Sequence, residues 1–256
     1  MDDIQNQVAT LRGLGIKSDN PRYLISQELV YKINRDIFHT TFSREEIQKQ
    51  AITLQTLGLI DPTYDYYSHI LERIDEGIGG FYIPITDEIF IIGEEFNGIE
   101  KIVYAHEYNH ALIDQHSDLE EMGAYPICRM DFDHCAAILG LVEGHATFLM
   151  YRWLEAYATE DDISFIKKEQ YAPNDKVISS SKILPPYLIR DATFKYLDGK
   201  SFVEFLYEIG GWRSVDQAYQ QLPETTEQIL HPEKYINGEL AIQVELFPID
   251  HILDDS

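Results

Sequence analysis

The stretch YAHEYNHALIDQH, residues 104–116, decides how the whole sequence is interpreted. It contains the pattern H-E-x-x-H, formed here by His106, Glu107 and His110. On an α-helix, side chains four residues apart lie on the same face, so both imidazoles can bind one metal ion while Glu107 lies beside it. The spacing predicts a zinc site. The alternative is a surface or core helix that happens to carry two histidines.

The residues around the motif predict that it lies in the middle of a helix. Asn97 and Glu100 have the spacing of a capping box, in which each side chain binds the backbone of the other residue at the start of a helix. Apolar residues then follow at helical spacing, namely Ile102, Val103, Ala105, Leu112 and Ile113.

The composition excludes some classes of partner. The chain has 256 residues, enough for one large domain or two closely packed lobes, and its net charge of -24 repels phosphate backbones and anionic membranes. We therefore expect no nucleic-acid partner, and the lack of a long apolar run predicts no membrane span. The start of the chain has no signal-peptide pattern, so a cytoplasmic location is the default unless the chain is a trimmed mature form.

The sequence before the motif predicts helices around a small sheet. Residues 1–20 end in LRGLGIKSDN, whose glycines, together with Asn20-Pro21, predict irregular structure, and a strand over 22–25 and a helix over 26–38 are expected next. A capping box at Ser43 predicts the next helix, which ends at Gly58, and residues 64–76 are predicted to form another.

A β-hairpin is predicted immediately before the motif helix. The stretch GFYIPITDEIFIIG, residues 80–93, reads as two short strands around a turn at Thr86 and Asp87. Pro84 cannot donate a backbone hydrogen bond, so the first strand is expected to lie at an edge or to end there. Such an edge can pair with an extended peptide, and an ordinary sheet edge is an equal alternative.

After the motif, Asp131 is expected to cap a long buried helix. Gly140 and Gly144 share a face of that helix and would let it approach another helix closely, with Glu143 next to that face.

Residues 171–186 are predicted to form a loop and a candidate flap over the site. Helices are then expected over 187–196 and 201–208, separated by Asp198-Gly199, and after a capping box at Thr225 and Gln228.

The two cysteines are expected to be free thiols. Cys128 and Cys135 would lie about 10 Å apart on one continuous helix, which is too far for a disulfide bond.

Three residues compete to be the third metal ligand. His116 matches the last histidine of the metzincin pattern, but Ile113 stands where that pattern requires glycine. Glu143 can be delivered by the second helix, and we favour it. His145 points to a different face from Glu143 and is expected to support the site or to lie in the core.

The sequence resembles the gluzincins, the thermolysin-related H-E-x-x-H zinc metallopeptidases. More narrowly, it is similar to a group of compact bacterial zinc-peptidase-like proteins. The resembling segments span Leu11 to Tyr235 and are LRGL, LGLID, GGFYIP, HEYNHALIDQH, LVEGHAT, EIGGW and TTEQILHPEKY.

The resemblance implies an α+β, mostly helical, zincin-like fold in a single domain, residues 1–256. Its N-terminal lobe, 1–120, would hold the sheet and the motif helix, and its helical lobe, 121–256, would hold the helix with the glutamate ligand. It implies one zinc ion bound by His106, His110 and Glu143 of this chain, with Glu107 as the general base of peptide-bond hydrolysis. The partners would be peptide or protein substrates.

Two positions depart from the family pattern. Thr147 stands where gluzincins often place an aspartate that orients a ligand histidine, and His145 stands where the closer group has aspartate. Asp114, one turn after His110, is an alternative orienting residue. These departures leave a second function open, that of a weakly active or inactive zincin-fold protein that binds or chaperones peptides.

His231 is the candidate for stabilising the oxyanion of the reaction. Gluzincins use a histidine or tyrosine from the C-terminal lobe for this purpose, and residues 225–235 also offer Tyr235. Pro232 restricts the backbone before it and so fixes the direction of the imidazole. The alternative is a buried histidine that is satisfied by a backbone carbonyl.

Overall fold

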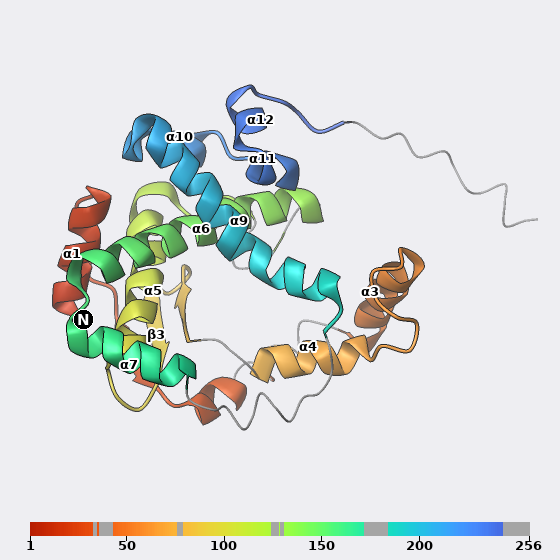
Figure 1. Ribbon diagram of the computed structural model, residues 1–256, viewed down its shortest axis with the longest axis horizontal. Coiled ribbons are helices and arrows are strands. Elements are labelled where there is room, and N and C mark those ends of the chain that lie inside the picture. Colours follow the sequence, from red (N-terminus) through yellow and green to blue (C-terminus); the bar gives the residue numbers. More distant parts are fainter. Residues whose placement is uncertain are drawn as a thin grey trace, which may run out of the picture.

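The computed structural model describes residues 1–32, 35, 43–75, 79–123, 128, 131–171 and 184–242. The described chain is α+β and mostly helical, with one small sheet, as the sequence predicts (Figure 1). The predicted flap lies largely outside the described residues, as does the end of the predicted helix 26–38. In chain order the elements are α1 Asp2–Arg12, β1 Arg22–Ile25, α3 Arg44–Thr56, α4 Tyr66–Asp75, β2 Gly80–Ile83, β3 Glu88–Ile92, α5 Gly98–Ser117, α6 Phe132–Tyr157, α7 Glu160–Tyr171, α9 Pro186–Gly210, α10 Trp212–Gln220, α11 Thr226–Leu230 and α12 Pro232–Ile236.

The three strands form a sheet in the order β1-β3-β2. β2 and β3 are the predicted antiparallel hairpin, and β1 pairs with β3 in parallel. Because side chains alternate across a strand, Ile89 and Ile91 face the core, whereas Phe90 stacks between Phe81 and Tyr23 on the other face. Because the strand order is β1-β3-β2, β2 is an edge strand, and it lies beside α5.

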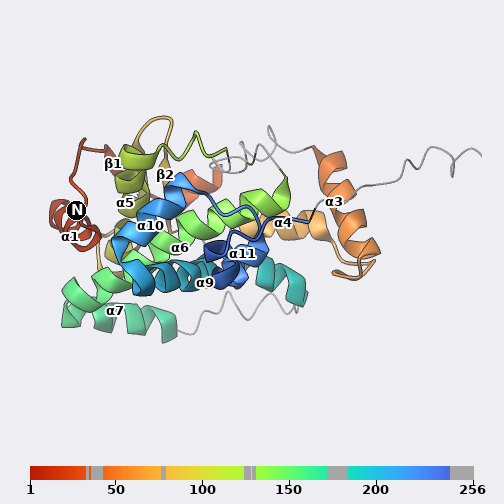
Figure 2. The same cartoon turned by 90° about the horizontal axis from the view of Figure 1, so that it is seen from above.

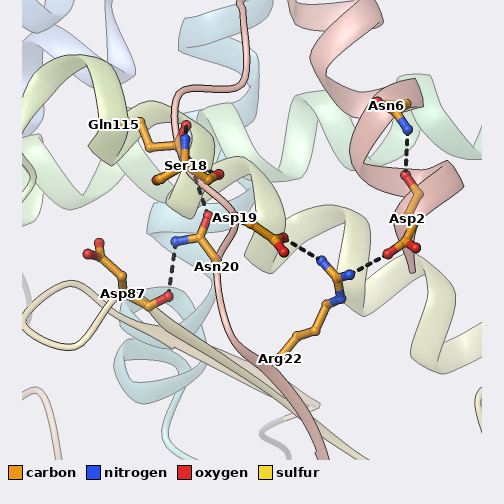
Figure 3. Close-up of polar contacts among 8 residues, drawn as sticks. All are labelled: Asp2, Asn6, Ser18, Asp19, Asn20, Arg22, Asp87 and Gln115. Carbon is orange, nitrogen blue, oxygen red and sulfur yellow. Dashed lines mark hydrogen bonds and ion pairs between the residues drawn. The ribbon is translucent and has the colours of Figure 1, made fainter.

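Polar contacts hold the N-terminal segment against the sheet and α5 (Figure 3). Arg22 of β1 forms ion pairs with Asp19 and with Asp2 of α1. Asn20 is buried, donates to the carbonyl oxygen of Asp87 and accepts from Gln115 near the end of α5. These contacts hold α5, the helix that carries the motif, in place against the sheet.

α6 is the central helix. Its N-cap is Asp131, as predicted, and it contributes side chains to all three hydrophobic clusters of the described chain. Leu149 packs with the sheet, α1 and α5, Phe148 packs with α9 and α10, and Ile138 packs with the end of α5. α6 therefore packs with elements of both predicted lobes, 1–120 and 121–256.

The glycines of α6 let it approach another helix closely, as predicted, and that helix is α9. A Cβ atom on Gly144 would lie 2.1 Å from the carbonyl carbon of Gly199, and a Cβ on Gly199 would lie 2.1 Å from the carbonyl oxygen of Gly140. The predicted break at Asp198-Gly199 is wrong, because α9 runs unbroken from Pro186 to Gly210. α6 and α9 lie against each other (Figure 2), and Gly199 permits their close packing.

The sequence does not predict α1 and α10, and it does not separate α7 from α6 or α12 from α11. α1 precedes most of the stretch expected to be irregular, buries Ile4 and Val8, and ends at Gly13, which has the left-handed conformation. α7 is distinct from α6, because the chain leaves the helical conformation at Ala158.

Cys128 and Cys135 form a disulfide bond, so the expectation of free thiols is wrong. That expectation assumed one continuous helix. α6 starts at Phe132, so Cys128 lies outside it, and the two Cα atoms are 5.8 Å apart, a separation that a disulfide bond can span.

None of the helices within the described ranges is both long enough and apolar enough to cross a membrane.

Candidate metal centre

Three side chains from two helices converge at one point. His106 and His110 lie one turn apart on α5, and Glu143 reaches them from the middle of α6. The Nε2 atoms of the two histidines are 3.2 Å apart, and Oε2 of Glu143 lies 3.2 Å from that of His106 and 3.4 Å from that of His110. His110 and Glu143 are buried, while His106 keeps 12% of its side chain exposed. The predicted ligand group is thus assembled, with one member open to solvent.

The geometry of this triangle fits a metal ion. Two ligand atoms at about 2.0 to 2.1 Å from a tetrahedral zinc ion would be about 3.3 Å apart. If both imidazoles instead donated a proton to the same carboxylate oxygen, two N–H groups would face each other across 3.2 Å. A cation bound to all three lone pairs removes that conflict. His106, His110 and Glu143 are therefore a buried group that can hold a metal ion.

The second oxygen of Glu143 has a different partner. Lys195 of α9 donates from Nζ to Oε1 at 3.1 Å. Burial alone raises the pKa of Glu143, but hydrogen bonds from His106 and His110 outweigh it, with Lys195 adding to their effect, so the pKa lies well below its usual value. Glu143 is therefore charged at neutral pH, as a metal ligand must be.

Glu107 lies beside the ligands and is also buried. Its pKa is raised to about 7, mainly by burial and also by the negative charge of Glu143, while the nearby His106 and Lys195 oppose the increase. Its side chain also accepts a hydrogen bond from the backbone of Tyr82 in β2. Glu107 is thus held between the metal ligands and the edge strand. A divalent cation bound nearby would lower its pKa and so favour the carboxylate, the form that accepts protons.

An open cavity of about 340 Å³ adjoins His106 and Glu107. Its wall includes the hydroxyl-bearing residues Thr147 of α6 and Tyr196 of α9. The ring of Tyr196 lies 6.1 Å from that of His106, centre to centre. The remaining lining is mostly apolar or glycine and comes from Gly79, Gly80, Val103, Met150, Tyr151 and Leu197. The site therefore has an open space of this volume beside the residues that can hold a metal ion.

Two other residues weighed for the metal lie elsewhere. His116, near the end of α5, donates from Nε2 to the carbonyl oxygen of Gly15 at 2.9 Å and is not in the ligand group. His145 is fully buried, accepts from Arg12 through Nε2 and donates through Nδ1 to Tyr219. It supports the packing of α1, α6 and α10.

The expected orienting residues do not contact the ligands through any hydrogen bond that we observe. Asp114 accepts from the hydroxyl of Tyr82 at 2.7 Å and from the backbone of Leu119. In the described part of the chain, the buried hydroxyl of Thr147 has no hydrogen-bond partner. Thr147 therefore lines the cavity without replacing the aspartate of the family pattern.

His231 lies between α11 and α12 with half of its side chain exposed. Its ring nitrogens are 3.8 Å from carboxylate oxygens of Glu227 and Glu233. It does not line the cavity beside the ligands, and neither does Tyr235, whose hydroxyl donates to the carbonyl of Gln221. The oxyanion role of His231 remains a prediction that these contacts do not favour.

Lys195 and Tyr196 are the site residues that the sequence analysis missed. They lie in α9, which is predicted as two separate helices, and neither residue belongs to a motif. Only the packing of α9 across α6 brings them to Glu143 and His106. With a helix break at Asp198-Gly199, the sequence does not predict that packing.

No protein-family model, curated protein or solved structure matches this chain.

Proposed function

We propose that this protein is a zinc-dependent peptidase of the gluzincin type. The observation that carries the proposal is the convergence of two imidazoles and a carboxylate, with Glu107 beside them at an open cavity. Two nitrogen ligands and one oxygen ligand match the donor set of hydrolytic zinc sites, which keep a fourth position for water or substrate.

Each residue of the site has a role in this proposal. A zinc ion held by His106, His110 and Glu143 would polarise the substrate carbonyl and acidify water. Glu107 accepts a proton from the attacking water as its oxygen bonds to the carbonyl carbon. Glu107 then delivers that proton to the leaving nitrogen when the peptide bond breaks. Its position between the ligand group and β2 supports both transfers.

Tyr196 is the donor that we assign to the oxyanion. Its ring lies near His106, and it lines the cavity next to Glu107. A hydroxyl that donates to the oxygen as negative charge develops stabilises the transition state more than the ground state. This position supports Tyr196 over His231, which lies at the junction of two short helices and does not line the cavity.

The arrangement of β2 supports an extended peptide as substrate. β2 is an edge strand, and its backbone at Tyr82 already contacts Glu107. A peptide paired with such an edge would run past the metal centre, and one of its side chains could enter the cavity. The cavity borders Gly80, the first residue of β2, and Gly79 just before it, so the edge strand and the cavity adjoin.

The proposal is tested by measuring metal content and peptide hydrolysis in the same preparations. Wild-type protein should bind one zinc ion, cleave members of a mixed peptide library, and lose activity on chelation and regain it with zinc. Glu107→Gln should keep the zinc and lose hydrolysis by a factor of at least about 100. Cleavage by Glu107→Gln at the wild-type rate would rule out the proposed mechanism.

A zinc protein that binds peptides without cleaving them is the second candidate. Thr147 favours it, because its hydroxyl, within the described chain, orients neither histidine ligand. Zinc content with peptide binding, but with no product by mass spectrometry, would select this alternative.

A further inference from the structure

The two oxygens of the Glu143 carboxylate have separate partners. Oε2 lies 3.2 Å from Nε2 of His106 and 3.4 Å from Nε2 of His110. Oε1 accepts a hydrogen bond from Lys195 Nζ at 3.1 Å. One oxygen therefore faces the imidazoles, and the other is held by a cation from a third helix.

The crossing of α6 and α9 explains how Lys195 reaches this position. Gly144 follows Glu143 directly and lies against the backbone of Gly199, which is one turn after Lys195 on α9. Any side chain at these glycines would push the two helices apart. Their contact keeps the lysine within hydrogen-bonding distance of the carboxylate, and its ammonium also lies 4.8 Å from the ring centre of Tyr196.

Two effects of Lys195 on a bound metal oppose each other. Its charge repels a cation, whereas its hydrogen bond fixes the orientation of the ligand carboxylate. The bond is made to the oxygen that does not face the imidazoles, and 34% of the lysine side chain is exposed, so solvent screens the repulsion. Glu143 is buried, so removing the charged donor Lys195 leaves its carboxylate without a hydrogen bond that solvent does not replace. That loss should weaken metal binding more than removal of the screened repulsion strengthens it. Orientation should therefore dominate.

We propose that Lys195 is a positioning residue that holds Oε1 of Glu143, so that the carboxylate presents only Oε2 to the metal. The inference rests on the metal site of the proposed function but not on hydrolysis. Removing a partner that orients a metal ligand typically weakens metal binding by about 10- to 100-fold. A carboxylate freed from Lys195 can also bind the metal through both oxygens, which changes the coordination number.

The test compares wild type with Lys195→Met, Lys195→Arg and Lys200→Met. Lys200 is a matched control because it lies on the same helix and forms its own ion pair with Glu204 at 2.8 Å. Zinc dissociation constants are measured by competition with a chromophoric chelator, and visible absorption spectra are recorded with cobalt(II). Circular dichroism verifies that each variant is folded. If Lys195→Met does not fold, Lys195→Gln takes its place.

We expect Lys195→Met to weaken zinc binding about 10- to 100-fold and to alter the cobalt spectrum. Lys195→Arg, which keeps the charged donor, should bind zinc within about threefold of wild type, as should Lys200→Met. Unchanged or tighter zinc binding by Lys195→Met, with an unchanged cobalt spectrum, would overturn the inference. A wild-type protein that binds neither metal would instead overturn the metal centre, so the two failures are distinguishable.

Discussion

Glu107 and Glu143 are buried carboxylates in one site, and their surroundings shift their pKa values in opposite directions. Burial dominates at Glu107 and raises its pKa. Hydrogen bonds from two histidines prevail over burial at Glu143 and lower its pKa. A carboxylate with a low pKa suits a permanent ligand, and one with a pKa near neutrality suits proton transfer. Neighbouring contacts therefore divide the roles of two chemically similar residues.

A tyrosine substitution separates the two candidates for the oxyanion donor. Tyr196→Phe removes only the hydroxyl and should lower kcat about 100-fold while zinc content stays at the wild-type level. His231→Ala should leave kcat unchanged, because His231 is half exposed and lies by Glu227 and Glu233. Steady-state kinetics on one cleaved peptide checks both variants. The reverse pattern would restore the role that the sequence suggests for His231.

At the scale of elements, the crossing of α6 and α9 places the cavity wall and the lysine partner of Glu143. Gly144 and Gly199 touch through backbone atoms, so the helices are closer than side chains would permit. α9 then contributes both Lys195 and Tyr196 to the site. The close contact at Gly199 thus determines which groups Lys195, one turn away, can reach.

Gly144→Ala tests this crossing. Alanine favours a helix by about 1 kcal/mol over glycine. Its Cβ would nevertheless lie 2.1 Å from a backbone atom of Gly199, which no side-chain rotation can relieve. We expect a net loss of about 2 kcal/mol in the free energy of unfolding, together with weaker zinc binding as Lys195 moves away. Urea unfolding measures the loss, and a stabilised Gly144→Ala protein would contradict the close contact.

Gly15→Ala is the matched control for that substitution. A Cβ atom at Gly15 would meet no atom within 4 Å, and its φ angle lies outside the left-handed region. Its free energy of unfolding should stay within about 1 kcal/mol of wild type.

The elements that local signals specify could be predicted from the sequence. The capping residues Asn97 and Asp131 mark the starts of α5 and α6, and the spacing of the histidines identifies two members of the group that can hold a metal ion. Gly199 misled the prediction because glycine disfavours an isolated helix but permits close packing in a folded one. Lys195 could not be recognised, since its role exists only where α9 crosses α6. Tertiary contacts, absent from local patterns, account for both failures.

At the scale of the molecule, acid stability depends partly on the contact between α5 and α7. Asp162 of α7 is buried, pairs with Lys101 of α5 and accepts from Thr159. Burial raises the pKa of Asp162, but these partners outweigh it and lower the pKa below its usual value. The folded state therefore favours the charged form. Its contribution is complete above the unfolded pKa of about 3.9 and is lost as the pH falls through the lower folded value.

Asp162→Asn should reduce the free energy of unfolding by about 2 kcal/mol at pH 7, because Lys101 loses its charged partner. The difference from wild type should persist to about pH 5 and shrink below about pH 4. Urea unfolding at several pH values measures it. Asp161→Asn is the control, since Asp161 is exposed on the same helix. An equal loss in both variants, or a difference independent of pH, would contradict the assignment.

The position of α6 in all three hydrophobic clusters has a thermodynamic consequence. A helix shared in this way cannot detach from one cluster without exposing apolar surface in the others, so the segments around it should unfold in one cooperative transition. α3 and α4 pack on each other at one end of the molecule and stand outside that unit (Figure 2). An ion that binds Glu143 would thus stabilise the whole central unit in proportion to the logarithm of its concentration. Hydrogen exchange in α3 and α4 would be insensitive to the same ion.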